Sequence, residues 1–311
     1  MTYPKYIDRR SGTEKTEKVY GKLFIDLLYG TNWIARFFSF FLLPLFSRVR
    51  CLSQFYGAIQ KSRLTRGKIK PFIQKFHVDK SEFLDPVESF QSFNDFFVRK
   101  LKPTARPIIP TDDTVILPAD ARYLAYQNID EVDGFFVKGQ KYSLETLLCD
   151  AALADRYAKG AMVIARLAPV DYHRFHFPLA CLPGVPKPIE GNLFSVNPIA
   201  LQRHVNIPTE NKRALTKLET KHCGTVLFIE VGATYVGTIH QTFTPNKPQA
   251  KGAEKGYFSF GGSCLILLFE QNTLQIDSDL LEATHRRIET LSQFGQSLGK
   301  IRSQSFVVSH D

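Results

Sequence analysis

Residues 251–270 read KGAEKGYFSFGGSCLILLFE, and this stretch decides how the C-terminal half of the chain folds. The run 265–269 is continuously apolar, which is typical of a strand buried on both faces of a sheet. Gly261 and Gly262 can turn the chain at little steric cost, because glycine adopts positive φ readily. A tight turn that leads into a buried strand therefore explains the segment on structural grounds alone. Ser263 stands where the turn meets the strand.

Short runs of the same kind recur upstream, separated by Pro and Gly, at residues 115–117, 162–167, 226–231 and 235–239. They predict a mostly antiparallel sheet, arranged as a barrel or a sandwich. Residues 1–110 read instead as helical, and three prolines between residues 102 and 110 mark a boundary. We therefore expect an α+β protein with a helical region over residues 1–110 and a β-rich domain over residues 111–311. Residues 277–298 are expected to form one amphipathic helix.

The positive charge of the chain is concentrated near its start. The formal net charge is +10, yet no Asp or Glu occurs between Leu27 and Val78, a stretch that holds nine Lys and Arg. The aromatic run at 33–46 is shorter than the about 20 apolar residues of a transmembrane helix, and Arg36 and Pro44 interrupt it. Phe- and Leu-rich sequence beside basic residues suits a helix that lies in the membrane interface, where each Lys or Arg contributes about 1 kcal/mol.

Residues 20–76 are therefore predicted to dock on an anionic membrane surface. The same segment could instead be a core helix or a nucleic-acid site. Its contiguous aromatic residues argue against a nucleic-acid site, because such sites space aromatic residues singly between polar ones. Five cysteines without a Cys-x-x-Cys pair form neither a disulfide framework nor a metal cluster. The aromatic run begins too late for a secretory signal peptide. We expect a peripheral protein on the cytoplasmic face of the cell membrane.

Candidate catalytic side chains lie at 171–176, which reads DYHRFH. A serine hydroxyl is a weak nucleophile until a base takes its proton, and this segment offers two imidazoles and an acid. The histidine pair also admits a zinc site, although two further ligands with recognisable spacing are missing nearby. Two partly buried structural histidines remain a third reading. Asp120, within Pro-Ala-Asp, is ordinary turn chemistry by itself.

Six segments of the chain are read together: FNDFFVRKLKP at 93–103, LPADA at 117–121, LAPVDYHRFHFP at 167–178, GNLFSVNP at 191–198, VGATYVG at 231–237 and the Gly-Gly-Ser segment. In combination and in this order, they resemble the phosphatidylserine decarboxylase family over most of the chain. The resemblance implies that the chain cuts itself between Gly262 and Ser263, into a β chain of residues 1–262 and an α chain of residues 263–311. Ser263 would become a pyruvoyl group, the covalent cofactor, because only a residue with a β leaving group can eliminate to dehydroalanine. No metal is implied.

The resemblance further implies that the pyruvoyl group forms a Schiff base with phosphatidylserine, releasing CO2 and phosphatidylethanolamine, and that the protein is a homodimer. By position, His176 would be the base for self-cleavage, with Asp120 orienting it as in a Ser-His-Asp triad and Asp171 as a second acid. His173 would act on the mature enzyme. The chain departs from the family pattern at Cys264, where relatives carry threonine, and at Ala121, where many carry glycine.

Two hypotheses from other classes stay open. The first is a lipid-directed serine hydrolase that uses Ser263, His176 and Asp120 in an uncut chain, although the Gly-x-Ser-x-Gly nucleophile elbow is missing. The second is a lipid-binding protein with an inactive site. Four arginines are candidates for a head-group phosphate, although surface ion pairing explains each as well: Arg166, Arg174, Arg203 and Arg213.

Overall fold

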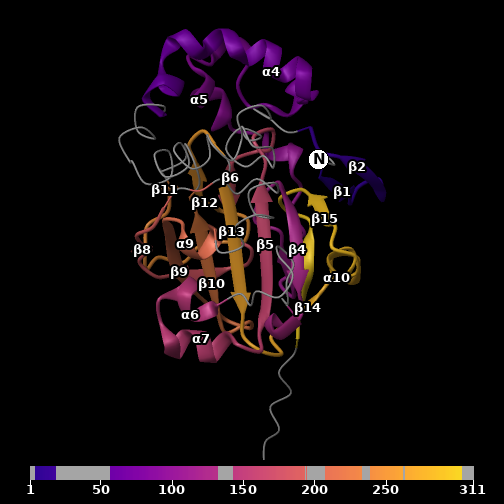
Figure 1. The fold of residues 1–311 in the computed structure, drawn as a ribbon, viewed down its shortest axis with the longest axis vertical. Helices are drawn as coiled ribbons and strands as arrows, with labels where there is room; N and C mark the ends of the chain where they lie inside the picture. Colours follow the sequence, from indigo (N-terminus) through magenta and orange to yellow (C-terminus); the bar gives the residue numbers. More distant parts are fainter. Residues whose placement is uncertain are drawn as a thin grey trace, which may run out of the picture.

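The computed structural model describes residues 4–18, 57–131, 143–192, 194, 207–232, 239–261 and 263–302. A ten-stranded sheet forms its centre (Figure 1). The strands follow the order β2 (Thr13–Thr16), β1 (Lys5–Asp8), β15 (Glu289–Ser292), β4 (Ala121–Tyr126), β5 (Ala161–Leu167), β13 (Ser263–Phe269), β10 (Thr225–Val231), β9 (Arg213–Thr220) and β7 (Cys181–Pro183), and β8 (Lys187–Ile189) also pairs with β9.

The predicted α+β class and the mostly antiparallel sheet are confirmed. Every pairing in the large sheet is antiparallel except that of β1 with β15, which is parallel. Within the described residues, the path is open, because β2 at one edge has no pairing with β7 or β8 at the other. Of the two arrangements expected, a barrel or a sandwich, the described sheet is therefore not closed into a barrel.

The central strands are apolar throughout because both faces of the sheet are covered. Side chains at 264, 266 and 268 of β13 belong to one hydrophobic cluster, and those at 265, 267 and 269 belong to another, as the two-residue period of a strand requires. The strands expected at 115–117, 162–167, 226–231 and 265–269 are all present. Of the strand expected at 235–239, residues 235–238 lie outside the described residues.

Different elements cover the two faces. The helices α6 (Leu144–Leu148), α7 (Ala151–Tyr157) and α9 (Ile207–Glu210) contribute to the first cluster. The second cluster includes side chains from α10 (Ser278–His285) and from two three-stranded sheets. One of these sheets is β11 (Ile239–Gln241), β12 (Glu254–Phe258) and β6 (Arg174–His176); the other is β14 (Leu274–Ile276), β16 (Ser297–Ile301) and β3 (Thr114–Ile116).

The single helix expected over residues 277–298 is wrong. α10 ends at His285, and Arg287 has a φ of +59°, the left-handed conformation that ends a helix. The chain then enters β15, which pairs with β4, and β16, which pairs with β3 and β14. Gly299 allows this close approach, since a Cβ there would lie 2.2 Å from the Gln275 carbonyl oxygen. Pairing with β3 and β4, both more than 100 residues away in the sequence, therefore overrides the local helical spacing of apolar residues.

The helical expectation for residues 1–110 is also wrong at its start, because β1 and β2 form a hairpin there. The later part is helical, in short pieces: η1 (Arg63–Lys68), α4 (Ile69–Phe76), η2 (Lys80–Glu82), η3 (Val87–Ser89), α5 (Phe93–Phe97) and η4 (Pro103–Ala105). A domain division at residue 110 stays a prediction. Residues 19–56, which hold much of the expected docking region, lie outside the described residues.

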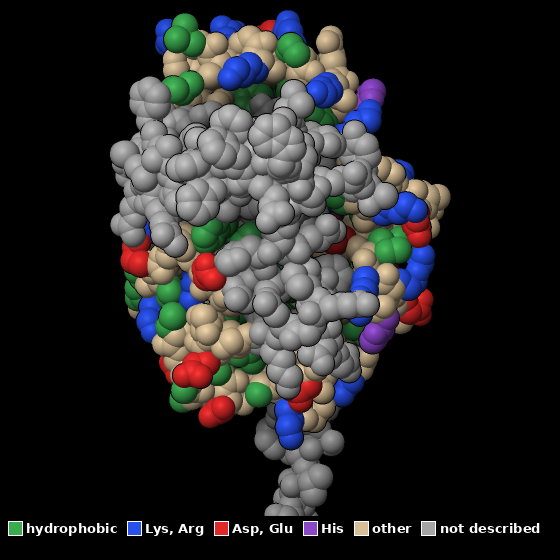
Figure 2. Space-filling model, viewed as in Figure 1, with side chains coloured by type: hydrophobic (Ala, Val, Ile, Leu, Met, Phe, Trp, Pro, Cys, Tyr) green, Lys and Arg blue, Asp and Glu red, His purple; other side chains and the backbone are tan. Residues whose placement is uncertain are grey.

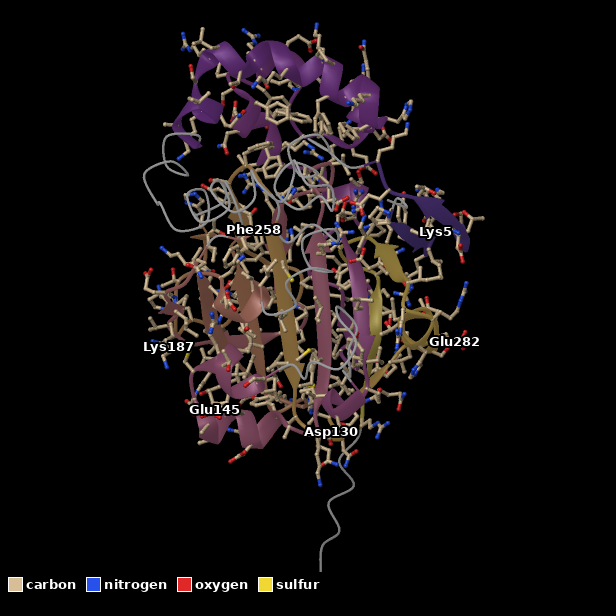
Figure 3. All side chains as sticks on the ribbon, in the orientation of Figure 1. Lys5, Asp130, Glu145, Lys187, Phe258 and Glu282 are labelled. Carbon is tan, nitrogen blue, oxygen red and sulfur yellow. The ribbon has the colours of Figure 1, made fainter. Side chains whose placement is uncertain are left out.

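We call residues 57–101 the cap. A cluster of phenylalanines forms its interior, and Phe260 from the segment before β13 belongs to the same cluster. Figure 1 shows α4 and α5 above one end of β5, β6 and β13. Phe258 lies at this end of the sheet, below the cap (Figure 3). The Gly-Gly-Ser segment therefore enters the sheet directly beneath the cap.

Candidate active site

Ser263 is fixed at the end of the central strand. It is the first residue of β13 and lies opposite Leu167, the last residue of β5, with none of its surface exposed. Gly261 has a φ of +140°, a conformation that L side chains rarely adopt, and Gly262 lies outside the described residues. The turn and the strand that the sequence predicts around Ser263 therefore meet at a buried hydroxyl.

His173 is the imidazole that meets this hydroxyl. It lies between β5 and β6, and its Nδ1 is 3.4 Å from the Ser263 Oγ. Its Nε2 lies 3.0 Å from the carbonyl oxygen of Ala168. A carbonyl only accepts hydrogen bonds, so Nε2 carries the proton and Nδ1 presents its lone pair to Ser263. The arrangement is that of a nucleophile beside a base.

Asp171 orients His173 through the backbone. Its carboxylate accepts the N–H of Ala168 at 2.7 Å and the Arg122 guanidinium at 2.5 Å. Its own N–H donates to the Ala168 carbonyl at 2.9 Å, the same oxygen that accepts from His173. Asp171 thus closes the turn that holds the imidazole. Burial raises the pKa of Asp171, against the opposing effect of Arg122.

His176 makes a different set of contacts, with Gly252 and Phe294. Its Nδ1 is 3.0 Å from the Gly252 carbonyl oxygen, and its ring stacks on Phe294 at 3.8 Å. Among the described residues, its buried Nε2 has no hydrogen-bond partner. The carboxylate of Asp120 accepts from Arg106 at 2.6 Å and from the Phe294 N–H at 2.9 Å. Asp120 and His176 are thus linked through Phe294.

The direct contact expected between His176 and Ser263 is not found, because among the described residues the Ser263 hydroxyl has His173 as its partner. A triad would also have a direct hydrogen bond between the Asp120 carboxylate and the His176 imidazole; here Phe294 lies between them, donating its N–H to Asp120 and stacking on His176. The structure therefore brings Ser263, His173 and Asp171 together and leaves His176 and Asp120 as a neighbouring pair.

Both imidazoles are neutral at physiological pH. Burial lowers the pKa of His173 to about 3, and the nearby charges of Arg99 and Arg122 act in the same direction. Burial likewise lowers the pKa of His176 to about 4. A neutral imidazole with a free lone pair accepts a proton, which is what a serine nucleophile needs.

The candidate phosphate ligands are already engaged. Arg166 binds Glu17 and Glu289, and Arg174 binds Glu254. Arg213 donates to the carbonyl oxygens of Thr146, Leu147, Thr209 and Asn211, and Arg203 lies outside the described residues. The described residues contain no group of three or more His, Cys, Asp and Glu that could hold a metal ion.

Two site residues were missed by sequence reasoning. The Phe97 ring stacks on His173 with centroids 3.8 Å apart, and Asn94 accepts the N–H of Phe260 at 2.9 Å. Both lie in the segment 93–103 that carried the resemblance, but nothing in the residue types indicated their contacts.

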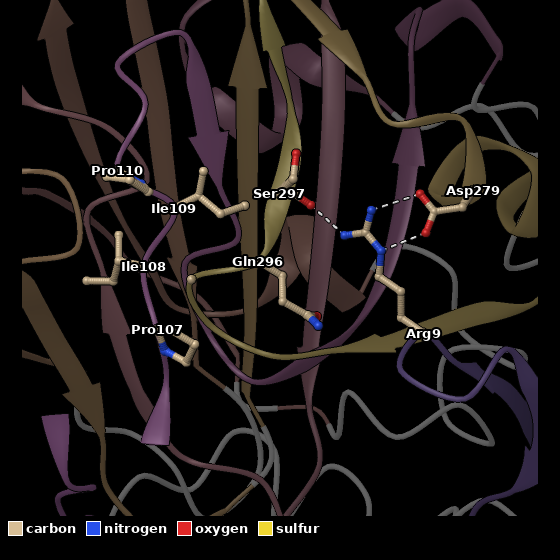
Figure 4. Close-up of a pocket in the computed structure, with 9 residues that line it drawn as sticks. Arg9, Pro107, Ile108, Ile109, Pro110, Asp279, Gln296 and Ser297 are labelled. Carbon is tan, nitrogen blue, oxygen red and sulfur yellow. Dashed lines mark hydrogen bonds and ion pairs between the residues drawn. The ribbon is translucent and has the colours of Figure 1, made fainter. Parts of the chain in front are cut away.

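A pocket of about 520 Å³ lies elsewhere, and neither Ser263 nor His173 lines it. Its walls come from 107–110 and 295–297 together with Arg9 and Asp279, which are joined by an ion pair at 2.6 Å (Figure 4). Because the Arg9 charge is already neutralised, the pocket offers no evident reactive group.

Comparison with known proteins gives a consistent result. A family model described as phosphatidylserine decarboxylase matches residues 93–300. The phosphatidylserine decarboxylase proenzyme of Chlamydia pneumoniae is 46% identical over 302 residues, which cover 96% of this chain and 98% of that protein. The proenzyme of Chlamydia caviae is 48% identical over 296 residues, covering 95% and 97%. That of Chlamydia muridarum is 46% identical over 296 residues, covering 95% and 96%.

Proposed function

The chain belongs to the phosphatidylserine decarboxylase family, and from that premise we propose that Ser263 and His173 carry out its self-processing. The enzyme is a carboxy-lyase that converts phosphatidylserine into phosphatidylethanolamine and CO2 with a pyruvoyl group made from its own serine. The observation that supports the division of roles is the 3.4 Å approach of the Ser263 Oγ to the His173 Nδ1.

Self-cleavage begins when His173 takes the hydroxyl proton of Ser263. The Oγ attacks the carbonyl carbon of Gly262, the peptide C–N bond breaks, and the freed nitrogen receives the proton, so that an ester replaces the amide. Removal of the Ser263 Cα proton then breaks the Cβ–O bond and releases the Gly262 carboxylate. The remaining dehydroalanine is an enamine, which becomes an imine when a proton moves from its nitrogen to Cβ; water then adds to the C=N bond, ammonia leaves, and a ketone remains at position 263.

The residues around Ser263 fit such a group. β13 is hydrogen-bonded to β5 on one side and to β10 on the other, so β13 stays in the sheet after the cut. Position 263 then remains beside the neutral imidazole of His173, which can take up a proton there. When formed, the pyruvoyl group supplies an electron sink for the electrons released with CO2.

Mass spectrometry of the denatured protein tests the proposal. We expect two chains, cut between Gly262 and Ser263, with the shorter one blocked at its N-terminus, and one intact chain of 35.4 kDa for Ser263→Ala. His173→Gln should leave most of the chain uncut, whereas His176→Gln should cut more slowly but to completion. If His176→Gln stays uncut and His173→Gln cuts to completion, the base is His176, oriented by Asp120, as the resemblance implies.

We also propose that the protein docks peripherally on an anionic membrane, on the cytoplasmic face of the cell membrane. The described part of the expected docking region, 57–76, carries six exposed Lys and Arg and no acid. Within it, the Leu64 side chain is 92% exposed and that of Ile59 is 41% exposed. Figure 2 shows basic and hydrophobic side chains together at the cap end. No helix among the described residues is long and apolar enough to cross a membrane.

Sedimentation with vesicles tests the docking. The protein should sediment with phosphatidylglycerol vesicles at low salt and not with phosphatidylcholine vesicles, and Arg63→Glu with Arg66→Glu should weaken binding. Lys187→Glu, on an exposed strand away from the cap (Figure 3), is the control and should bind normally. Equal loss in both variants would contradict docking through the cap.

The homodimer that the resemblance implies remains a proposal, which light scattering of the processed protein tests.

A further inference from the structure

The short helix α5 contacts both halves of the reacting pair. Phe97, at its C-terminal end, stacks on His173 with ring centroids 3.8 Å apart and an angle of 26° between the planes. The Asn94 Oδ1 accepts the backbone N–H of Phe260 at 2.9 Å, three residues before Ser263. The Phe260 ring in turn packs against Phe93 and Phe97, with centroids 5.1 and 5.0 Å away.

Tertiary contacts hold α5 itself in place. A helix of five residues is too short to be stable alone. The Ser92 Oγ caps it by accepting the Asp95 N–H at 3.1 Å, and the Phe93 N–H donates to the Thr65 Oγ1 at 3.0 Å. Thr65 belongs to η1. The position of Asn94 and Phe97 is therefore set by the packing of the cap.

The segment that α5 holds leads into two glycines. Gly261 and Gly262 precede Ser263, and glycine has the largest backbone freedom of any residue. Attack of a hydroxyl on a neighbouring carbonyl requires the reacting atoms to be held about 3 to 3.5 Å apart in a narrow orientation. An anchor just before the glycines restricts the conformations that the segment can adopt. The Asn94 hydrogen bond to Phe260 is such an anchor.

We propose that Asn94 is a positioning residue for self-cleavage. Its side-chain oxygen holds the backbone that leads into Ser263, while Phe97 holds the imidazole of His173 opposite. This inference rests on the proposed function, because it concerns the geometry of the same reaction. Asn94 touches no reacting atom, so its effect is on the rate of cleavage and not on the chemistry.

Cell-free synthesis followed by a time course of chain cleavage tests the proposal. Asn94→Leu keeps the size of the side chain but loses the acceptor, and cleavage should slow by about 10-fold to 100-fold. Asn94→Asp keeps an acceptor oxygen and should restore most of the rate. Asn128→Leu is the matched control: the Asn128 Oδ1 also accepts one backbone N–H, from Asp130 at 3.1 Å, at the opposite end of the sheet (Figure 3). It should cleave at the wild-type rate.

Wild-type cleavage by Asn94→Leu, or equal slowing by Asn94→Leu and Asn94→Asp, overturns the proposal. Unfolding of each variant in the Ser263→Ala background separates slow cleavage from loss of the fold. Should Asn94→Leu lack a cooperative transition, Asn94→Ala replaces it, because it removes the acceptor without adding a larger apolar group; slower cleavage supports the proposal, and wild-type cleavage overturns it. A wild-type chain that never cleaves contradicts the proposed function instead, so the two failures are distinguishable.

Discussion

At the scale of single residues, the site depends on how a few backbone groups are held. The Ala168 carbonyl accepts from both Asp171 and His173, so one backbone oxygen links the acid to the imidazole. A direct carboxylate–imidazole contact is therefore not needed to set the tautomer of His173. Burial lowers the pKa of His173 to about 3, so the imidazole is neutral at physiological pH and its Nδ1 lone pair faces the Ser263 hydroxyl.

Gly261 supports a residue-scale prediction. Its φ of +140° strains any residue with a Cβ. We expect Gly261→Ala to lower the free energy of unfolding of the Ser263→Ala chain by about 1 to 3 kcal/mol and to slow cleavage. Gly184→Ala is the control, because a Cβ at Gly184 would lie 3.6 Å from the nearest atom, an ordinary contact. Urea unfolding and a cleavage time course measure both effects; identical behaviour of the two variants would contradict the prediction.

At the scale of elements, the N-terminal hairpin is tied to the site through buried charges. Glu17 follows β2 and is 5% exposed. Its carboxylate lies 2.6 Å from Arg166 and 3.5 Å from Arg122, the residue that also binds Asp171. These two guanidiniums lower the pKa of Glu17 to about 2, although burial alone would raise it. The hairpin thus neutralises buried charge beside the active-site turn.

Removing the charge of the Glu17 carboxylate should lower the stability of the folded chain. Glu17→Gln leaves two buried guanidiniums with less compensation, so we expect the free energy of unfolding to fall by about 3 to 5 kcal/mol. Glu14→Gln, on β2 of the same hairpin, removes an exposed partner of Lys5 and Arg286 and should cost at most about 1 kcal/mol. Urea unfolding in the Ser263→Ala background checks both values. Similar costs for the two variants would show that Glu17 is not the charge that holds the hairpin.

At the scale of the whole molecule, the buried histidines make stability depend on pH. In the unfolded chain, both His173 and His176 titrate near the usual value of 6.5, whereas burial lowers their pKa values to about 3 and about 4 in the folded chain. Between these values the unfolded chain binds more protons than the folded chain. The free energy of unfolding therefore falls as the pH falls below 6.5.

Each histidine should contribute up to about 1 kcal/mol per pH unit in this window. Unfolding of the Ser263→Ala chain between pH 5 and 7 measures the slope. Protonation of Glu17 also lowers the free energy of unfolding, but it does so at lower pH, because this carboxylate titrates from its usual pKa of 4.5 downward. Adding His173→Gln or His176→Gln should flatten the curve. Curves parallel to that of the parent chain would mean that the two histidines are not buried in their neutral form.

The amino-acid sequence by itself determined the local features of the protein. Continuous apolar runs predicted the central strands, because a strand covered on both faces needs no polar side. The glycine pair before an apolar run placed Ser263 at a turn–strand junction, and the order of the segments identified the family. Each of these features depends on residues close together in the chain.

The tertiary structure alone decided which histidine meets Ser263 and how residues 277–298 fold. His173 and His176 are three residues apart in the same motif, so neighbouring sequence does not distinguish them. Their roles depend on Ser263, ninety residues away, and on the turn that Asp171 closes. Apolar residues within 277–298 have the spacing of a helix, but 289–292 and 297–301 form strands, because hydrogen bonds to the distant strands β3 and β4 outweigh a weak local preference.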